Sequence, residues 1–367
     1  METATDTNSK PQPIVADLVR RIWARDYSLW PEPSPGGGGD WMGWLDLPTA
    51  LYDRATPAET ALSGITSFNI LGMGGSSLTP EVLSHLFPES QPSLNVFDTV
   101  NPATISNAID TLDLETSVFV VASKSGTTVE PLSLESVFRE ALEARGIGDV
   151  SSRFVAISDP ETPLANRAET GQFALHIATP ANVGGRFSAL SAFGMFPAEI
   201  CNMPIDEMKR SAVDMADRCG VENFTNPGIE LGMFMASNAL RGRDKVTFAM
   251  SPSLERFGLW LEQLLAESTG KNSRGLVPIA GEPPLPSDAY GNDRQFIRIS
   301  VADEPQPDNP AFREHPTFNI ELPDRPAIAG EFFRWEFATA VAACAIGVYP
   351  FDQPDVESAK QLARKAL

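Results

Sequence analysis

The stretch Val120-Val-Ala-Ser-Lys-Ser-Gly-Thr-Thr-Val-Glu-Pro131 decides the fold, because it closes a strongly apolar strand with turn residues that favour a helix start. Similar apolar runs, each followed by turn residues and a helical segment, are Phe68–Leu71, Leu94–Asp98, Ser117–Ser123, Phe154–Asp159 and Ala174–Ile177. Strands that alternate with helices form a parallel sheet covered on both faces. The sequence therefore predicts an α/β, doubly wound fold.

A second set of strands follows a break near Asn202-Met-Pro-Ile-Asp206, which leads into helical periodicity. The predicted strands of this set are Val246–Ser251, Leu276–Ala280, Phe296–Val301 and Thr317–Leu322. We therefore expect two lobes of similar size, without a sequence repeat between them. The expected domains are residues 1–50, with an N-terminal tail, a helix and a Pro/Gly loop; residues 51–205, the first lobe; and residues 206–367, the second lobe with a C-terminal helix.

The N-terminal region combines a helical pattern with a loop. Apolar residues recur at helical spacing at Val15, Leu18, Val19, Ile22 and Trp23. The following stretch Trp30-Pro-Glu-Pro-Ser-Pro-Gly-Gly-Gly-Gly-Asp40 predicts a loop, because proline lacks an N–H donor and glycine is entropically costly to order. We expect residues 41–47 to return to the core.

Composition limits the class of protein. With 367 residues, 42% of them apolar and 21% charged, the chain is globular. Cys201, Cys219 and Cys344 are far apart and odd in number, so we expect buried thiols and neither disulfides nor a zinc site. A formal net charge of −20 argues against nucleic acid or anionic membrane as a partner. Without a signal peptide pattern or an apolar run of membrane-spanning length, we expect a soluble cytoplasmic protein.

A glycine-rich stretch, Leu71-Gly-Met-Gly-Gly-Ser-Ser-Leu-Thr-Pro-Glu81, follows the first predicted strand and indicates an anion site. Its glycines let backbone N–H groups approach an anion, and Ser76 and Ser77 add hydroxyl donors at a helix start. Asp98, after the next strand, would suit the ribose of a dinucleotide, but the third glycine of that fingerprint is missing. This stretch alone leaves a nucleotide and a simpler phosphate equally open.

The second motif favours a simple phosphate. Ser123, Ser125, Thr127 and Thr128 place four hydroxyls around Lys124 at the carboxyl end of a strand, where open α/β sheets bind ligands. A helix N-cap would explain one or two of these hydroxyls but not all four. Because no pocket for a base or ribose is evident, we expect a phosphate nest.

Five ordered segments resemble those of the phosphoglucose isomerase family. They are Gly74-Gly-Ser76, Ser123–Thr128, Val183-Gly-Gly-Arg-Phe-Ser188, Gln263-Leu-Leu-Ala-Glu-Ser-Thr-Gly-Lys271 and Phe351-Asp-Gln followed by Val356-Glu-Ser-Ala-Lys-Gln-Leu-Ala363. The similarity covers approximately Gly64 onward, and Gly43-Trp-Leu-Asp-Leu-Pro48 and the compact length resemble the isomerase half of bifunctional transaldolase/phosphoglucose isomerase proteins. The resemblance implies two sugar-isomerase (SIS) domains, no metal or other cofactor, a sugar-phosphate substrate, a homodimer and a link to a transaldolase.

The resemblance also assigns roles to individual residues. It implies that Glu267 transfers the proton between C2 and C1, that Arg186 stabilises the enediolate and that Lys360 assists ring opening. The substrate-binding residues it implies are Gly75, Ser76, Ser123, Lys124, Ser125, Thr127, Thr128 and Gln263. Independently, Leu254, Phe257, Leu261, Leu264 and Leu265 form a helical stripe. That stripe places Glu267 in the last turn before Gly270, where the macrodipole disfavours negative charge, with Gln263 one turn earlier. The rival roles are a solvated glutamate for Glu267 and a salt bridge for Arg186.

One departure concerns ring opening. Asp293 or Arg294 stands where the family has a histidine after a Gly-Glu-Pro segment, and arginine cannot accept a proton. None of His85, His176 and His315 matches the motif; packing roles are expected for the first two, and His315 is the weak candidate for a substitute.

We expect isomerisation of glucose 6-phosphate and fructose 6-phosphate through an enediol intermediate. The alternatives are an isomerase that also accepts mannose 6-phosphate, a sugar-phosphate-sensing module without catalysis, and a nucleotide-dependent dehydrogenase.

Overall fold

The computed structural model describes residues 11–50 and 62–354, with side chains from Ile14 onward. The described parts of Asp46–Lys209 and Pro252–Trp260 form one compact unit, which we call the β1–β5 unit. The described parts of Met1–Leu45, Arg210–Ser251 and Leu261–Leu367 form the other, which we call the β6–β9 unit. Among the described residues, no helix is both long and apolar enough to cross a membrane. The predicted C-terminal helix lies outside the described residues.

The β1–β5 unit is built on a parallel sheet. Its strands are β1 (Ser67–Gly72), β2 (Ser93–Phe97), β3 (Ser117–Ala122), β4 (Phe154–Ser158) and β5 (Leu175–Ala178). In space their order is β2-β1-β3-β4-β5. All neighbours are parallel, and the register pairs Gly72 of β1 with Ala122 of β3. The loops after β1 and β3 therefore leave the same edge of the sheet side by side.

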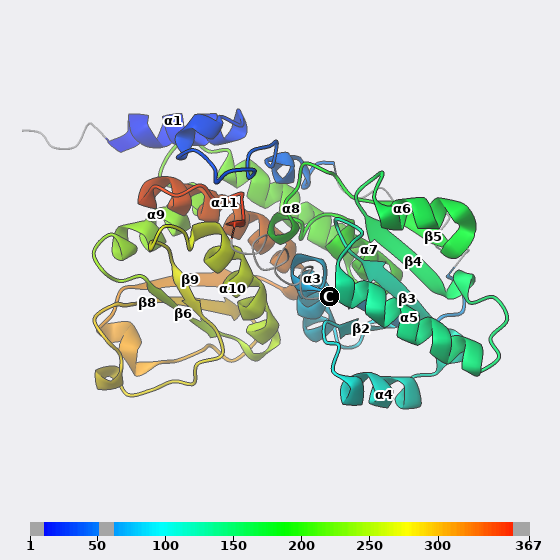
Figure 1. Cartoon of the computed structure of the whole chain (residues 1–367). Helices are drawn as coiled ribbons and strands as arrows, with labels where there is room; N and C mark the ends of the chain where they lie inside the picture. Colours follow the sequence, from blue (N-terminus) through cyan, green and yellow to red (C-terminus); the bar gives the residue numbers. More distant parts are fainter. Residues whose placement is uncertain (1–10, 51–61, 355–367) are drawn as a thin grey trace, which may run out of the picture. The chain divides into compact units, whose positions relative to one another are not determined.

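Helices cover both faces of this sheet, as the apolar runs predict (Figure 1). They are α3 (Leu78–Leu86), α4 (Pro102–Thr111), α5 (Val129–Ala144), α6 (Pro163–Arg167) and α7 (Ala192–Ile200). Residues of α4, α5 and α6 share a core cluster with Phe119 and Phe154 of the sheet. On α7, Phe196 packs against Phe68 of β1, with ring centroids 5.7 Å apart. The sheet is consequently buried on both sides.

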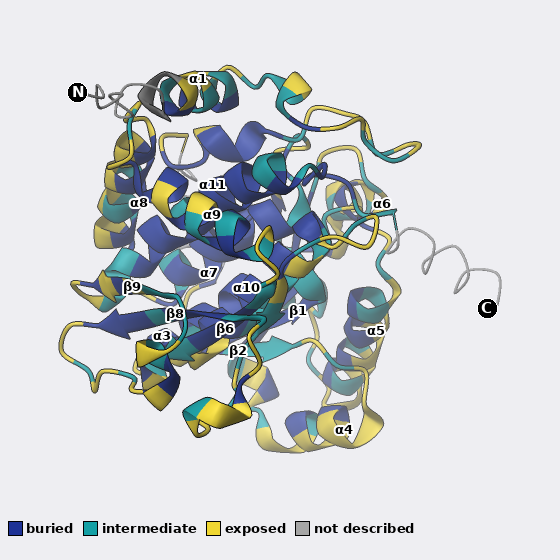
Figure 2. Cartoon of the chain, turned by 90° about the vertical axis from the view of Figure 1, so that its left-hand side faces the viewer, coloured by how far each residue is buried: buried dark blue, intermediate teal, exposed yellow. Residues whose placement is uncertain are grey.

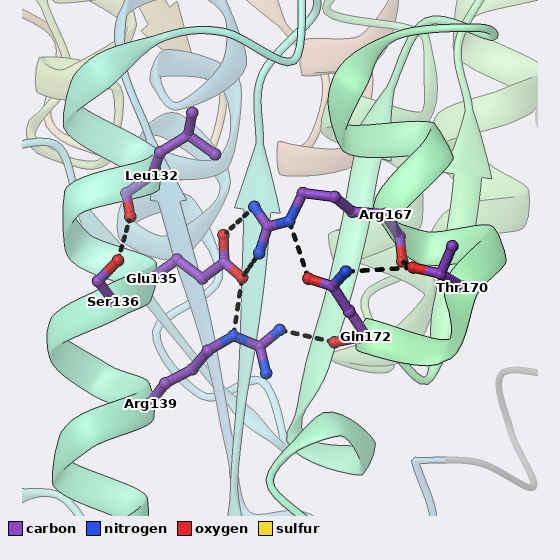
Figure 3. A network of polar contacts seen from close by, with 7 residues as sticks. All are labelled: Leu132, Glu135, Ser136, Arg139, Arg167, Thr170 and Gln172. Atoms are coloured by element: carbon purple, nitrogen blue, oxygen red, sulfur yellow. Dashed lines mark hydrogen bonds and ion pairs between the residues drawn. The ribbon is translucent and has the colours of Figure 1, made fainter.

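A charged network fixes α5 beside the sheet (Figure 3). Glu135, whose side chain is only 3% exposed, pairs with Arg139 Nε at 2.7 Å and with Arg167 Nη2 at 2.6 Å. The Arg139 guanidinium also lies 4.1 Å from the ring centroid of Phe154. Because α5 begins directly after the Ser123–Thr128 loop, this network also holds the helix that this loop enters.

The β6–β9 unit contains the second parallel sheet. Its strands are β6 (Lys245–Met250), β7 (Val277–Ile279), β8 (Arg294–Val301) and β9 (Thr317–Leu322), in the order β7-β6-β8-β9. The other α-helices among the described residues are α1 (Pro11–Trp23), α8 (Ile205–Cys219), α9 (Pro227–Ala239), α10 (Glu255–Thr269) and α11 (Ile328–Ile346). In the described residues, each strand lies within two residues of its predicted position, so the predicted α/β fold is confirmed.

Helix α11 is the centre of the β6–β9 unit. It lies beside α9 over the sheet and is buried along almost its whole length (Figure 2). Trp23 of α1 packs on Phe333 of α11, with ring centroids 6.0 Å apart. Trp44, from the segment that was predicted to return to the core, is fully buried and lies 5.6 Å from the same ring. The N-terminal residues thus cover an apolar helix that would otherwise face water.

Candidate functional site

The Ser123–Thr128 loop lies at the switch point of the first sheet. In a sheet of order 2-1-3-4-5 the connections leave β1 and β3 in opposite directions, and ligands bind outside the carboxyl ends of these two strands. The Ser123 hydroxyl is 1% exposed and donates to Thr128 Oγ1 at 2.9 Å. Ser125 and Thr127 are exposed, with their hydroxyls 2.9 Å apart. Ser123 therefore shapes the loop, while Ser125 and Thr127 present hydroxyls to solvent.

Gly126 makes the turn of this loop. Its φ is +65°, and its N–H donates to the Ser123 carbonyl at 3.0 Å. A Cβ at this position would lie 2.9 Å from Leu164 N, so only glycine fits.

The Lys124 side chain points to the carboxyl end of the neighbouring strand β4. Its ammonium pairs with the Asp159 carboxylate, just after β4, and donates to the Ala181 carbonyl at 3.1 Å. Thr179 donates to the other Asp159 oxygen at 2.6 Å, and the Asp159 N–H donates to the Lys124 carbonyl at 3.1 Å. The sequence alone gives no signal for Asp159, because its partner lies 35 residues away along the chain.

The Gly74–Ser76 turn, after β1, contacts the turn that carries Arg186. A Cβ on Gly75 would lie 2.3 Å from the Gly185 carbonyl oxygen, so the two backbones touch closely. Arg186 is 3% exposed. The Ser76 hydroxyl donates to the Met73 carbonyl at 3.1 Å. The structure thus brings Gly75, Ser76 and Arg186 together in the β1–β5 unit.

Gln263 and Glu267 form a pair in the last turns of α10, in the β6–β9 unit. Gln263 Nε2 donates to Glu267 Oε1 at 3.0 Å, and both side chains are partly exposed. All five residues of the predicted stripe are fully buried, so α10 presents the pair away from its core face. The helix ends at Thr269, whose hydroxyl accepts the Leu276 N–H at 2.9 Å. Lys360 lies outside the described residues.

Asp293 and Arg294, which stand where the family has a histidine, both form ion pairs. Arg294 makes two hydrogen bonds to Glu282, at 2.9 and 3.0 Å, and one to Thr247 at 2.7 Å. Asp293 pairs with Lys245 at 3.2 Å. Both therefore have structural partners in this unit.

The three histidines differ in burial: His85 is exposed, whereas His176 and His315 are partly buried. His85 Nε2 lies 3.1 Å from the Pro252 carbonyl oxygen, and His176 Nε2 lies 3.0 Å from Ser158 Oγ. Burial lowers the pKa of His176 below its usual value of 6.5. His315 lies beside the ring of Phe296, with centroids 5.5 Å apart. Within the described residues, no group of His, Cys, Asp and Glu is arranged to hold a metal ion.

These features define an α/β protein with a hydroxyl-lined loop at a sheet switch point. The chain belongs to the phosphoglucose isomerase family, because the family model matches residues 58–276, more than half of its length. It is 35% identical over 242 residues to a probable glucose-6-phosphate isomerase of Haloquadratum walsbyi, a match that covers 64% of this chain and 55% of that protein.

Other relatives match over more of their length. The glucose-6-phosphate isomerase of Rubrobacter xylanophilus is 28% identical over 386 residues, covering 87% of this chain and 88% of that protein. The crystal structure of a glucose-6-phosphate isomerase from Chlamydia trachomatis superposes with a TM-score of 0.76 at 18% identity, over 97% of this chain and 84% of that one. This structural match confirms the fold.

Proposed function

We propose that this protein interconverts glucose 6-phosphate and fructose 6-phosphate. The observation that carries this proposal is the hydroxyl loop at the β1/β3 switch point, in a chain of the phosphoglucose isomerase family. A phosphate needs several donors converging on one point, and this loop and the Gly74–Ser76 turn at the neighbouring strand end carry hydroxyl and backbone N–H donors that could meet this need. The net charge of −20 does not oppose this, because a small anion is held by local donors.

The β1–β5 unit would hold the phosphate. Ser125, Thr127 and Thr128 donate hydroxyls, and the Gly75-Ser76 turn offers N–H groups. Ser123 fixes the loop, and Lys124 holds it to Asp159, so we assign both of these residues to positioning the phosphate loop rather than to direct contact.

The β6–β9 unit would supply the base. We assign Glu267 to remove the proton from C2 of the open-chain aldose and return it to C1 of the enediol. The hydroxyl proton passes from O2 to O1 in the same conversion, so that the C1 carbonyl becomes a hydroxyl and the C2 hydroxyl becomes a carbonyl. Gln263, bonded to Glu267, would orient the carboxylate and contact substrate. Arg186 would stabilise the developing enediolate charge and Lys360 would assist ring opening.

The test is turnover of fructose 6-phosphate to glucose 6-phosphate, followed with a coupled dehydrogenase. We expect Glu267→Gln to lower kcat by about 100- to 10,000-fold, because loss of a general base costs this much. Glu255→Gln, at an exposed position of the same helix, is the matched control and should keep wild-type kcat. A folded Glu267→Gln variant with near wild-type kcat would exclude Glu267 as the base. Binding of the sugar phosphate without turnover by the wild-type protein would instead favour the sensing module.

Further measurements test the proposals on substrate range, oligomeric state and partner. Adding mannose 6-phosphate tests the broader isomerase. Light scattering of the purified protein tests the homodimer, and pull-down with a transaldolase tests that link. We propose the cytoplasm as the location, since phosphorylated sugars are the substrates.

A further inference from the structure

Lys271 makes a buried set of contacts just beyond α10. Its ammonium donates to the carbonyls of Tyr349 at 2.5 Å, Asp352 at 2.8 Å and Ser268 at 3.3 Å. It also forms an ion pair with Asp352 Oδ1 at 2.7 Å. The side chains of Lys271 and Asp352 are 8% and 2% exposed. One cation therefore ties the last turn of α10 to the segment 349–352.

Asp352 extends this set of contacts to the Pro/Gly loop. Its Oδ2 accepts the Ser34 N–H at 2.6 Å. A Cβ on Gly37 would lie 2.6 Å from Asp352 Cβ and 2.9 Å from its Oδ2, so the loop backbone lies directly on this carboxylate. Trp30, at the start of the loop, packs edge-on against Phe351 with ring centroids 5.1 Å apart. Three segments distant in sequence therefore converge on the Lys271–Asp352 pair.

The position of this pair relates it to the proposed base. Glu267 lies four residues before Lys271, in the turn whose Ser268 carbonyl Lys271 binds. Asp352 lies in the segment that follows α11. The pair joins the element that carries the proposed base to this segment.

A buried ion pair is a poor means of gaining stability, since desolvation of the two charges offsets most of their attraction. It is a good means of fixing geometry, because one ammonium has three donors and each has a defined acceptor here. A general base must be held within a fraction of an ångström to act.

We propose that Lys271 and Asp352 are positioning residues, which hold Glu267 in the geometry that proton transfer needs. This inference rests on the proposed isomerase function. The phosphate loop belongs to the other unit, so loss of the pair should affect kcat and leave substrate binding largely unchanged.

The experiment measures kcat, KM and thermal unfolding for Lys271→Met, Asp352→Asn and the double variant Lys271→Met/Asp352→Leu. We expect kcat to fall by about 10- to 100-fold in all three with KM changed by less than about threefold, because misplacing a base by about 1 Å costs this much. In the double variant no unpaired buried charge is left, so its thermal stability should recover while its kcat stays low.

Recovery of kcat together with stability in the double variant would overturn the proposal, because the pair would then be only structural. Wild-type kcat in folded single variants would overturn it as well. Wild-type protein without turnover would remove the isomerase function and this inference together, whereas an active wild-type protein with fully active variants removes only the inference.

A pair of loop variants tests the contribution of the Pro/Gly loop. Gly37→Ala places a methyl group against Asp352, whereas the nearest atom to a Cβ on Gly38 is 3.7 Å away, so Gly38→Ala is the matched control. We expect Gly37→Ala to lower kcat several-fold and Gly38→Ala to leave it unchanged. Equal kcat in the two variants would show that the Pro/Gly loop does not help Lys271 and Asp352 to position Glu267.

Discussion

Asp159 is the ion-pair partner of Lys124 and fixes the position of its ammonium group. Its carboxylate takes the Lys124 ammonium and the Thr179 hydroxyl, and its backbone N–H binds the Lys124 carbonyl. The carboxylate thus anchors the Ser123–Thr128 loop from the next strand of the sheet. Its side chain is only 15% exposed, so water does not easily replace it as the partner of Lys124.

We predict that Asp159→Asn raises KM for fructose 6-phosphate by about 5- to 50-fold, because the loop loses a charged anchor of about 1–2 kcal/mol. Steady-state kinetics and inhibition by inorganic phosphate measure this effect. Thr179→Val is the control, since it removes one hydrogen bond of Asp159 and keeps the Lys124 ion pair. A lower KM in Asp159→Asn would mean that the released Lys124 binds the phosphate directly, as the sequence resemblance implied.

For single residues, the sequence identifies which residues form the candidate site better than it identifies their long-range ion-pair partners. The hydroxyls of Ser123–Thr128 and the Gln263–Glu267 spacing were predictable, because loop and helix geometry place residues close in sequence near one another. The partners of Lys124 and Lys271 were not, because Asp159 and Asp352 lie 35 and 81 residues away. Only the folded chain brings such pairs together.

At the scale of elements, α5 depends on a buried carboxylate (Figure 3). Glu135 binds Arg139 in its own helix and Arg167 just before the turn that leads to β5. The Arg139 guanidinium bonds onward to the Gln172 carbonyl at 2.6 Å. Removing the carboxylate would leave both guanidinium groups without their charged acceptor.

We predict that Glu135→Gln lowers the free energy of unfolding by about 2–4 kcal/mol, somewhat less than for a fully buried pair because Arg167 is partly exposed. Urea denaturation at neutral pH measures this change. Glu140→Gln, on the exposed side of the same helix, should change stability by less than about 0.5 kcal/mol. Equal stability of the two variants would show that the network contributes little.

The strands and helices differ in how well the sequence pattern predicts them. The strands were predictable because each is a short buried run between turn residues. The sequence pattern does not identify helix α11, although it is the most completely buried helix of its unit. A helix that is buried on nearly all sides has no exposed polar face opposite an apolar one, so the 3.6-residue period that identifies a helix is lost.

At the scale of the whole molecule, the dominant feature is charge. The 48 acidic residues outnumber the 28 basic residues, which gives a formal net charge of −20. Many of the basic residues form ion pairs in the described part of the chain. Each neutralises its own partner and does little to offset the charge of the other acidic residues at the surface. Self-repulsion of such a surface destabilises the compact state.

We predict that sodium chloride raises the melting temperature, most steeply below about 0.2 M, because the screening length falls from about 30 Å at 0.01 M to about 10 Å at 0.1 M and only to about 3 Å at 1 M. Scanning fluorimetry at neutral pH across this range measures it. The composition gives an isoelectric point of about 4.5, so the same series near pH 5.5 has less charge to screen and should show a smaller rise. A melting temperature that is flat or falls with salt at neutral pH would mean that the internal ion pairs, which salt weakens, outweigh the surface repulsion.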